Sequence, residues 1–159
     1  QNSNRSRVAS ALARRWKAFI QPDQMELYLR LVREGGWWDL VDEIATKLIG
    51  AVWQRNRALV TPMADAWIDD EDMWVRRVSL IGQIKHKEET DEARLFDYCL
   101  RRAHEKEFFI RKAIGWALRE YSYSRPEAVI QFVGEHDEAL SGLSKREALK
   151  ALKRRGPRI

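Results

Sequence analysis

Apolar residues recur every three or four positions along almost the whole chain. No stretch shows the convincing alternation of apolar and polar residues that marks a half-buried strand. This spacing is typical of amphipathic helices that each bury one face, and it predicts an all-α protein. We expect helices near residues 6–20, 23–33, 37–52, 56–68, 72–85, 91–104, 107–122, 126–136 and 144–154.

The breaks between these segments carry residues that start or stop helices. Pro22, Gly35-Gly36 and Pro62 stand at such breaks, since proline suits a first turn and glycine tolerates the backbone conformation that ends a helix. Asp70, Ser124 and Ser144 stand where a side-chain oxygen would cap a first turn. The punctuation therefore agrees with the periodicity.

A short motif returns at a nearly constant interval. Its aromatic residue is Trp38, then Trp74, then Phe109, at spacings of 36 and 35 residues. The four copies, of which the last is weaker, are Trp38-Asp39-Leu40-Val41-Asp42, Trp74-Val75-Arg76-Arg77-Val78, Phe109-Ile110-Arg111-Lys112-Ala113 and Ser144-Lys145-Arg146-Glu147-Ala148. An interval of this length, filled by two helices, is typical of an α-solenoid of helical hairpins. We expect a single domain over residues 1–159.

Three copies of the motif carry a dibasic pair, and equivalent positions of stacked repeats line a common surface. The pairs are Arg76-Arg77, Arg111-Lys112 and Lys145-Arg146. The formal net charge of +5 also favours an anionic partner. The recurrence predicts a positive stripe suited to a phosphate backbone, and the alternative is three solvated surface pairs.

Two of the seven tryptophans lie outside the apolar stripes of their helices. Trp116 shares its side of the helix with Lys112 and Arg119, so its indole either packs against a neighbouring repeat or faces a partner. Trp38 and Asp42 are four residues apart, which makes them neighbours on the flank of another stripe.

An acid beside an aromatic ring is an arrangement that can bind a cationic group. The carboxylate of Asp42 can face a cationic centre while the Trp38 ring limits access of water. The alternative interpretation of Asp42 is an ion pair with Arg77 or another base of the next repeat.

The remaining polar and sulfur side chains suggest no further chemistry. Cys99 is the single cysteine and falls within an apolar pattern, so we expect a reduced core residue. His86, His104 and His136 lack metal-ligand spacing, and we expect neither a metal nor another cofactor. No apolar run is long enough for a membrane span and no signal peptide is visible. The chain begins with Gln1 instead of Met, which indicates a trimmed or truncated chain.

Four segments of the chain resemble the AlkD-like DNA alkylation repair glycosylases, which are built from HEAT-like repeats. They are Trp37-Trp38-Asp39-Leu40-Val41-Asp42, Trp74-Val75-Arg76-Arg77-Val78, the long segment from Glu107 to Tyr121, and Leu143-Ser144-Lys145-Arg146-Glu147-Ala148. The resemblance covers about residues 24 to 154. It implies an α-solenoid of HEAT-like helical hairpins with a basic, concave DNA-binding surface. The family normally has further N-terminal helices, which this chain would lack, and we expect residues 1–6 and 155–159 to be flexible ends.

The resemblance also implies roles for single residues. Asp42 is expected to be the catalytic carboxylate, Trp38 and Trp116 the aromatic pair that flanks the lesion nucleotide, and Arg77 a clamp on the DNA backbone. Further phosphate contacts are expected from charge and surface position at Arg76, Arg77, Arg111, Lys112, Arg119, Lys145 and Arg146.

The implied activity is hydrolysis of the N-glycosidic bond of N3- or N7-alkylated purines, such as 7-methylguanine and 3-methyladenine, in duplex DNA without base flipping. An alkylated purine already carries positive charge and leaves without protonation, and an ionised Asp42 would stabilise the positive charge that develops on the sugar. The expected partner is double-stranded DNA with alkylated bases, bound by a monomer without a cofactor. The expected location is the cytoplasm, at the nucleoid during repair.

Two other functions compete with this one. A non-catalytic HEAT-like-repeat protein that binds bent, branched or damaged DNA would keep the basic stripe. A protein–protein scaffold is the commonest use of α-solenoids, but it leaves the recurrent dibasic pairs and the outward tryptophans unexplained. Salt-dependent duplex binding separates DNA binders from a scaffold, and release of a free base separates an enzyme from a binder.

Overall fold

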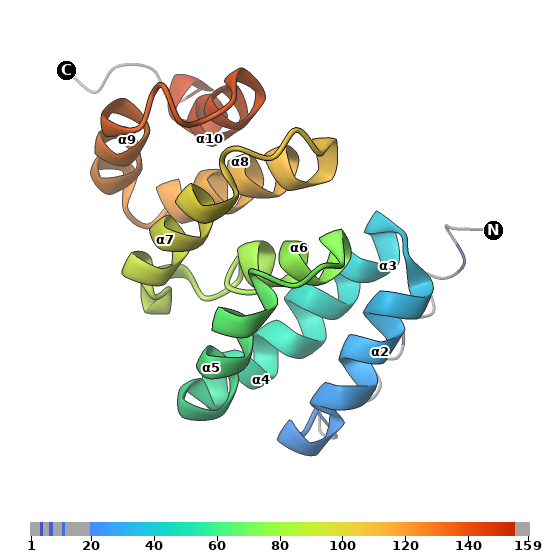
Figure 1. Cartoon of the computed structure of the whole chain (residues 1–159). Helices are drawn as coiled ribbons and strands as arrows, with labels where there is room; N and C mark the ends of the chain where they lie inside the picture. Colours follow the sequence, from blue (N-terminus) through green and yellow to red (C-terminus); the bar gives the residue numbers. More distant parts are fainter. Residues whose placement is uncertain (1–3, 5–6, 8–10, 12–19, 155–159) are drawn as a thin grey trace. The chain divides into compact units, whose positions relative to one another are not determined.

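The computed structural model describes residues 4, 7, 11 and 20–154, and every regular element within them is helical (Figure 1). This confirms the all-α prediction for the described part of the chain. The helix expected over residues 6–20 lies largely outside the described residues, as do the ends 155–159 and most of 1–6. The chain divides into two compact units, Gln1–Gly82 and Gln83–Ile159. A single domain, a continuous solenoid and a concave face remain predictions.

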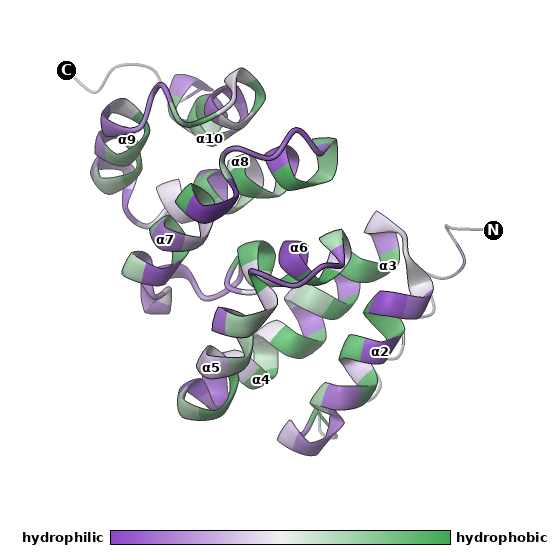
Figure 2. Ribbon diagram, viewed as in Figure 1, coloured by the Kyte–Doolittle hydropathy of each residue, from purple (hydrophilic) through white to green (hydrophobic). Residues whose placement is uncertain are grey.

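The first unit contains a succession of helices whose polar and apolar residues lie on different sides (Figure 2). In chain order they are η2 (Pro22–Gln24), α2 (Met25–Gly35), α3 (Trp38–Glu43), η3 (Ile44–Ile49), α4 (Gly50–Arg55), α5 (Arg57–Trp67) and α6 (Met73–Ile81). The turn between α2 and α3 uses Gly36 with a φ of 51°, in the left-handed region where glycine is favoured.

The elements α3, η3 and α4 follow one another without a break, where the sequence predicts one helix over 37–52. The middle of this helix is π-helical, which the periodicity does not reveal. The Thr46 hydroxyl donates a hydrogen bond of 2.7 Å to the carbonyl oxygen of Asp42. Such back-bonding to the preceding turn gives that carbonyl a partner where the helical hydrogen-bond pattern changes.

A close backbone approach fixes α4 against the end of α6. A Cβ added to Gly50 would lie 2.6 Å from the carbonyl oxygen of Gly82, so only a residue without a side chain fits there. Trp53 and Ile49 are fully buried beside this contact, in the core of the first unit. The helix that carries Asp42 and the helix that carries Arg77 are thereby held together.

The second unit is organised around its longest helix. The elements are η4 (Lys87–Glu89), α7 (Glu92–Arg102), α8 (Phe108–Ser122), α9 (Pro126–Glu135) and α10 (Gly142–Arg154). A Cβ on Gly115 would lie 2.5 Å from the Cβ of Glu147, and the Ser144 hydroxyl donates to the Arg111 carbonyl oxygen at 2.8 Å. These two contacts bring α10 close against α8.

Four expectations about helix ends are wrong. Pro62 lies inside α5, where it and Ala58 are exposed, so water can satisfy the carbonyl group that proline leaves without a partner. The cap of α6 is Asp72, whose carboxylate accepts from the Trp74 backbone N–H at 2.8 Å, and not Asp70. Ser144 is buried inside α10. The residue at the cap position of α9 is Arg125 and not Ser124.

Three further observations concern the described residues alone. Cys99 is buried and free, as expected. Among the helices that the structure describes, none combines the length and apolar character needed to cross a membrane. In the same residues, His, Cys, Asp and Glu side chains form no group of three that could hold a metal ion.

Candidate functional site

The centre of the first unit's candidate site is an ion pair between Asp42 on α3 and Arg77 on α6. Nε of Arg77 donates to Oδ1 of Asp42 at 2.8 Å, and Nη2 donates to Oδ2 at 3.0 Å. The Arg77 side chain is 6% exposed and the Asp42 side chain is 13% exposed. The ion pair that the sequence left open as an alternative for Asp42 is therefore formed. A two-pronged contact of this kind fixes the orientation of the carboxylate as well as its position.

The surroundings of Asp42 act on its pKa in opposite directions. Burial raises the pKa of Asp42 above its usual value, and the hydrogen bonds and charge of Arg77 oppose this rise without cancelling it. The neighbouring acids Glu43 and Asp39 add to the increase. Because a guanidinium group is always charged in proteins, we infer that the paired Asp42 is a carboxylate at neutral pH.

Trp38 begins α3 and is 44% exposed, one helical turn before Asp42. The core side of the same helix is formed by Val41 and Ile44, which are buried. Trp38 therefore contributes little to the core of this unit, and its indole is accessible on the turn that carries the carboxylate.

An aromatic contact joins α6 to the start of α3. The sequence did not indicate this contact as part of a site. The rings of Trp37 and Trp74 have their centroids 6.4 Å apart and are tilted by 56°. The signals in the sequence were the adjacent tryptophans Trp37 and Trp38 and the place of Trp74 at the aromatic position of the motif. This contact holds the end of α3 from which Trp38 projects.

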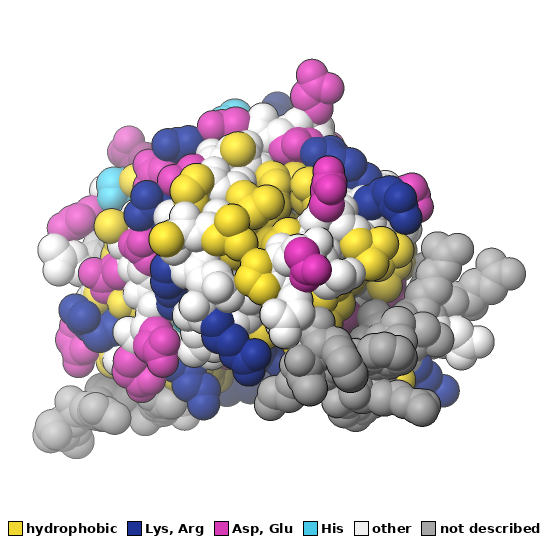
Figure 3. Space-filling model, turned by 90° about the horizontal axis from the view of Figure 1, so that it is seen from below, with side chains coloured by type: hydrophobic (Ala, Val, Ile, Leu, Met, Phe, Trp, Pro, Cys, Tyr) yellow, Lys and Arg dark blue, Asp and Glu magenta, His cyan; other side chains and the backbone are white. Residues whose placement is uncertain are grey.

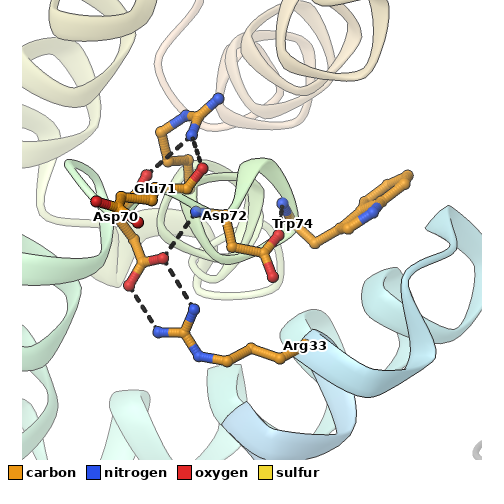
Figure 4. Close-up of polar contacts among 6 residues, drawn as sticks. Arg33, Asp70, Glu71, Asp72 and Trp74 are labelled. Carbon is orange, nitrogen blue, oxygen red and sulfur yellow. Dashed lines mark hydrogen bonds and ion pairs between the residues drawn. The ribbon is translucent and has the colours of Figure 1, made fainter.

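A polar network lies beside this aromatic contact (Figure 4). Arg33 on α2 donates to both carboxylate oxygens of Asp70, at 2.9 and 2.6 Å. Oδ1 of Asp70 also accepts from the Asp72 backbone N–H at 2.9 Å, and Asp72 caps α6 at Trp74. The network ties α2 to the loop from which α6 begins.

Arg76, an expected phosphate contact, takes part in the same loop. Its Nη1 donates to the carbonyl oxygens of Asp70 and Glu71, at 2.8 and 2.9 Å. This guanidinium therefore helps to order the start of α6.

The second unit carries a separate cluster of charge on α8 and α10. Lys112, Trp116 and Arg119 lie on one side of α8, at helical spacings of four and three residues. Glu147 on α10 binds both cations, with Lys112 Nζ 3.2 Å from Oε1 and Arg119 Nη1 3.0 Å from Oε2. Trp116 itself is half-buried. The sequence did not single out Glu147.

Glu147 is a stable carboxylate in these surroundings. Burial raises its pKa, but the hydrogen bond and charge of Lys112, with the charges of Lys150 and Arg119, outweigh burial. The pKa of Glu147 is consequently held below its usual value.

The other basic residues of the predicted stripe have varied environments. Nε of Arg111 donates to the Glu105 carbonyl oxygen at 3.0 Å. Lys145 binds the backbone and the carboxylate of Asp137, both at 3.0 Å. Arg146 is exposed. Alignment of these residues with those of the first unit in one stripe remains a prediction.

One face of the molecule shows hydrophobic side chains gathered among charged ones of both signs (Figure 3). Lys and Arg side chains lie there together with Asp and Glu side chains. That face is therefore not a surface of uniform positive charge.

Comparisons with known proteins place the chain in a family. The chain matches the family described as DNA alkylation repair enzyme over residues 2–152. A solved structure, a "Predicted DNA alkylation repair enzyme from Enterococcus faecalis", is 29% identical with a TM-score of 0.74. The match covers 92% of this chain and 66% of that one. No curated protein matches significantly. Because the family match spans most of the sequence, the chain belongs to the DNA alkylation repair enzyme family.

Proposed function

We propose that this chain is a DNA glycosylase that removes positively charged N3- or N7-alkylated purines, such as 7-methylguanine and 3-methyladenine, from duplex DNA. The observation that carries the proposal is the oriented carboxylate of Asp42, held by Arg77 at a largely buried position. The exposed indole of Trp38 lies one turn away on the same helix.

The chemistry requires a fixed negative charge near the glycosidic bond. When the bond of an alkylated purine breaks, electrons move to the cationic base and positive charge develops on the deoxyribose. A preoriented carboxylate stabilises this charge more effectively than water, because it need not reorganise during the reaction. Asp42 would also orient the water molecule that attacks the sugar carbon and accept its proton.

The tryptophans and the basic side chains serve binding in this proposal. The face of Trp38 is suited to contact with a cationic lesion nucleotide and excludes water from it. The family resemblance gives Trp116 the second aromatic position. Phosphate contacts would come from Lys112, Arg119 and Arg146, and the partner is duplex DNA in which the damaged base need not be flipped into a pocket.

A non-catalytic DNA-binding function is the second candidate, and one observation favours it. Both oxygens of Asp42 accept hydrogen bonds from Arg77, as they would in a purely structural ion pair. In that case the same helices would present basic side chains to DNA without cleaving a glycosidic bond. Loss of the Asp42 carboxylate would then affect the stability of the fold instead of a reaction.

The decisive experiment is release of 7-methylguanine from methylated duplex DNA by the full chain and by an Asp42→Asn variant. The asparagine retains the shape of the side chain and one acceptor oxygen for Arg77, but it has no charge. We expect release by the parent chain, none by the variant, and similar duplex binding by both. Salt-sensitive binding with no release by either chain would favour the non-catalytic function, and equal release by both would remove Asp42 from the mechanism.

A further inference from the structure

Two ion pairs in this molecule are related by the repeat. Asp42, Arg77, Lys112 and Glu147 follow one another at intervals of 35 residues. Asp42 pairs with Arg77 in the first unit, and Lys112 pairs with Glu147 in the second. Each pair joins helices from consecutive copies of the motif; Asp42 is the fifth residue of its copy, and Arg77, Lys112 and Glu147 are each the fourth.

The second pair differs from the first in its surplus of positive charge. Glu147 binds Arg119 as well as Lys112, and Lys150 lies one turn further along α10 and adds its field. The carboxylate reaches both cations because Gly115 lets α10 approach α8 closely. Its side chain is 15% exposed, so it is shielded but still open to solvent at one edge.

The arrangement imitates the way in which a phosphate group would be held. One carboxylate oxygen receives the Lys112 ammonium group at 3.2 Å, and the other receives the Arg119 guanidinium group at 3.0 Å. The phosphate oxygens of DNA are acceptors of the same charge and would compete for the same donors. The two cations are also among those that the proposed function assigns to the DNA backbone.

We propose that Glu147 competes with the DNA phosphate backbone for Lys112 and Arg119. It occupies both cations in the free protein and thereby lowers the affinity for any duplex. This inference rests on the proposed function only in that the chain binds DNA through these two cations. Glu147 would limit the sequence-independent electrostatic binding that holds a repair protein on undamaged DNA. Its carboxylate is then a determinant of selectivity and takes no part in the chemistry.

An ordinary structural role makes the opposite prediction about the sign of the effect. If Glu147 only positioned Lys112 and Arg119 for DNA, its removal would weaken binding. If it competes with phosphate, its removal frees both cations and strengthens binding. Glu147→Gln tests this because glutamine has the same shape as glutamate and lacks only the charge.

The experiment measures binding of the full chain to an undamaged, fluorescently labelled duplex by anisotropy over a series of NaCl concentrations. We expect Glu147→Gln to bind about 3- to 10-fold more tightly at low salt, with a slope of log K against log salt steeper by about 1 to 2, as one or two additional phosphate contacts imply. Glu135→Gln is the matched control, because it changes the net charge equally but bonds to Gln131 on α9 and not to the cluster. Binding equal to that of the parent is expected for the control.

A second variant keeps the test informative should glutamine disturb the packing of α8 and α10. Glu147→Asp retains the charge and withdraws the carboxylate by one methylene group, so a smaller gain in the same direction is expected. In a Lys112→Gln, Arg119→Gln background, the gain from Glu147→Gln should disappear, since neither of the two cations that Glu147 binds remains to be freed.

The outcomes separate this inference from the proposed function. A parent chain that binds with salt dependence, together with a Glu147→Gln variant no tighter than the Glu135→Gln control, overturns the competitor role and leaves the proposed function intact. Weaker binding by Glu147→Gln also overturns it, in favour of a positioning role. Absence of any salt-dependent binding by the parent chain overturns the proposed function, and the inference with it.

Discussion

Arg77 and Asp42 face one another across two helices that a contact between Gly50 and Gly82 holds together, and the guanidinium donates to both carboxylate oxygens. The pair lies near one end of a helix whose next turns are π-helical. A buried acid and base of this kind need one another, because either alone would be an uncompensated charge. Arg77 is therefore both a structural partner of Asp42 and a control on its protonation.

Removal of Arg77 should change the pH at which the enzyme loses activity. In the proposed mechanism, base release requires the Asp42 carboxylate, so the rate should fall as the pH decreases through the pKa of Asp42. Burial raises that pKa and Arg77 lowers it. The Arg77→Gln variant should thus lose activity at a higher pH than the parent chain, in a single-turnover pH profile of 7-methylguanine release. Arg76→Gln is the control, since Arg76 bonds to loop carbonyl groups, and an unchanged profile for Arg77→Gln would contradict the coupling.

The Arg33–Asp70 pair should contribute a small, pH-dependent stability. Its two contacts lower the pKa of Asp70, so the stabilisation is present above the pKa of the unfolded chain and is lost as the pH falls through the lower, folded-state value. Because the pair is partly exposed, Arg33→Gln should cost about 0.5 to 1 kcal/mol at neutral pH. Denaturant unfolding at neutral and acidic pH measures this cost. Arg30→Gln provides the comparison, since Arg30 meets Glu34 at 3.8 Å with both side chains well exposed, and it should have almost no effect.

The sequence predicted the helices well because amphipathic periodicity is a local property. It did not predict the π-helical turns of η3, since these accompany the Thr46 contact with the Asp42 carbonyl and the approach of Gly50 to Gly82, a residue more than thirty positions away. The interruption expected at Pro62 is absent because an exposed helix face tolerates a carbonyl bonded to water. The approach of Gly50 to Gly82 joins residues that are distant in the sequence, so a local pattern cannot reveal it.

The sequence predicted some residues of the candidate sites and missed others, again because it reveals local patterns but not contacts between distant residues. The motif identified Trp38, Asp42 and Arg77 as functional candidates, and the pairing of the last two was one of the open alternatives. Glu147 was missed because its importance depends on Gly115 and on the approach of α10 to α8. The successive 35-residue intervals that lead from Asp42 to Glu147 were nevertheless present in the sequence.

A methyl group at Gly115 should separate α8 from α10. Its Cβ would lie 2.5 Å from the Glu147 Cβ and 3.0 Å from the Ser144 carbonyl oxygen, so Gly115→Ala should destabilise the fold by about 1 to 3 kcal/mol. Gly134→Ala is a matched control inside α9, where an added Cβ meets no atom within 4 Å. It should stabilise the fold by about 0.5 to 1 kcal/mol, because alanine favours the helix. Thermal and denaturant unfolding measure both, and equal stability of the two variants would contradict the close contact.

The proposed mechanism also predicts which damaged bases the enzyme leaves in place. Asp42 is a carboxylate held by a guanidinium, so it can stabilise positive charge on the sugar but has no proton to give to a departing base. A 7-methylguanine is already cationic and leaves as a neutral base, whereas uracil would have to leave as an anion. Two duplexes of identical sequence, with either 7-methylguanine or uracil at one position, should thus give release of 7-methylguanine alone. Uracil release at a similar rate would require another group to stabilise or protonate the leaving base, and the charge of the lesion would no longer explain the choice of substrate.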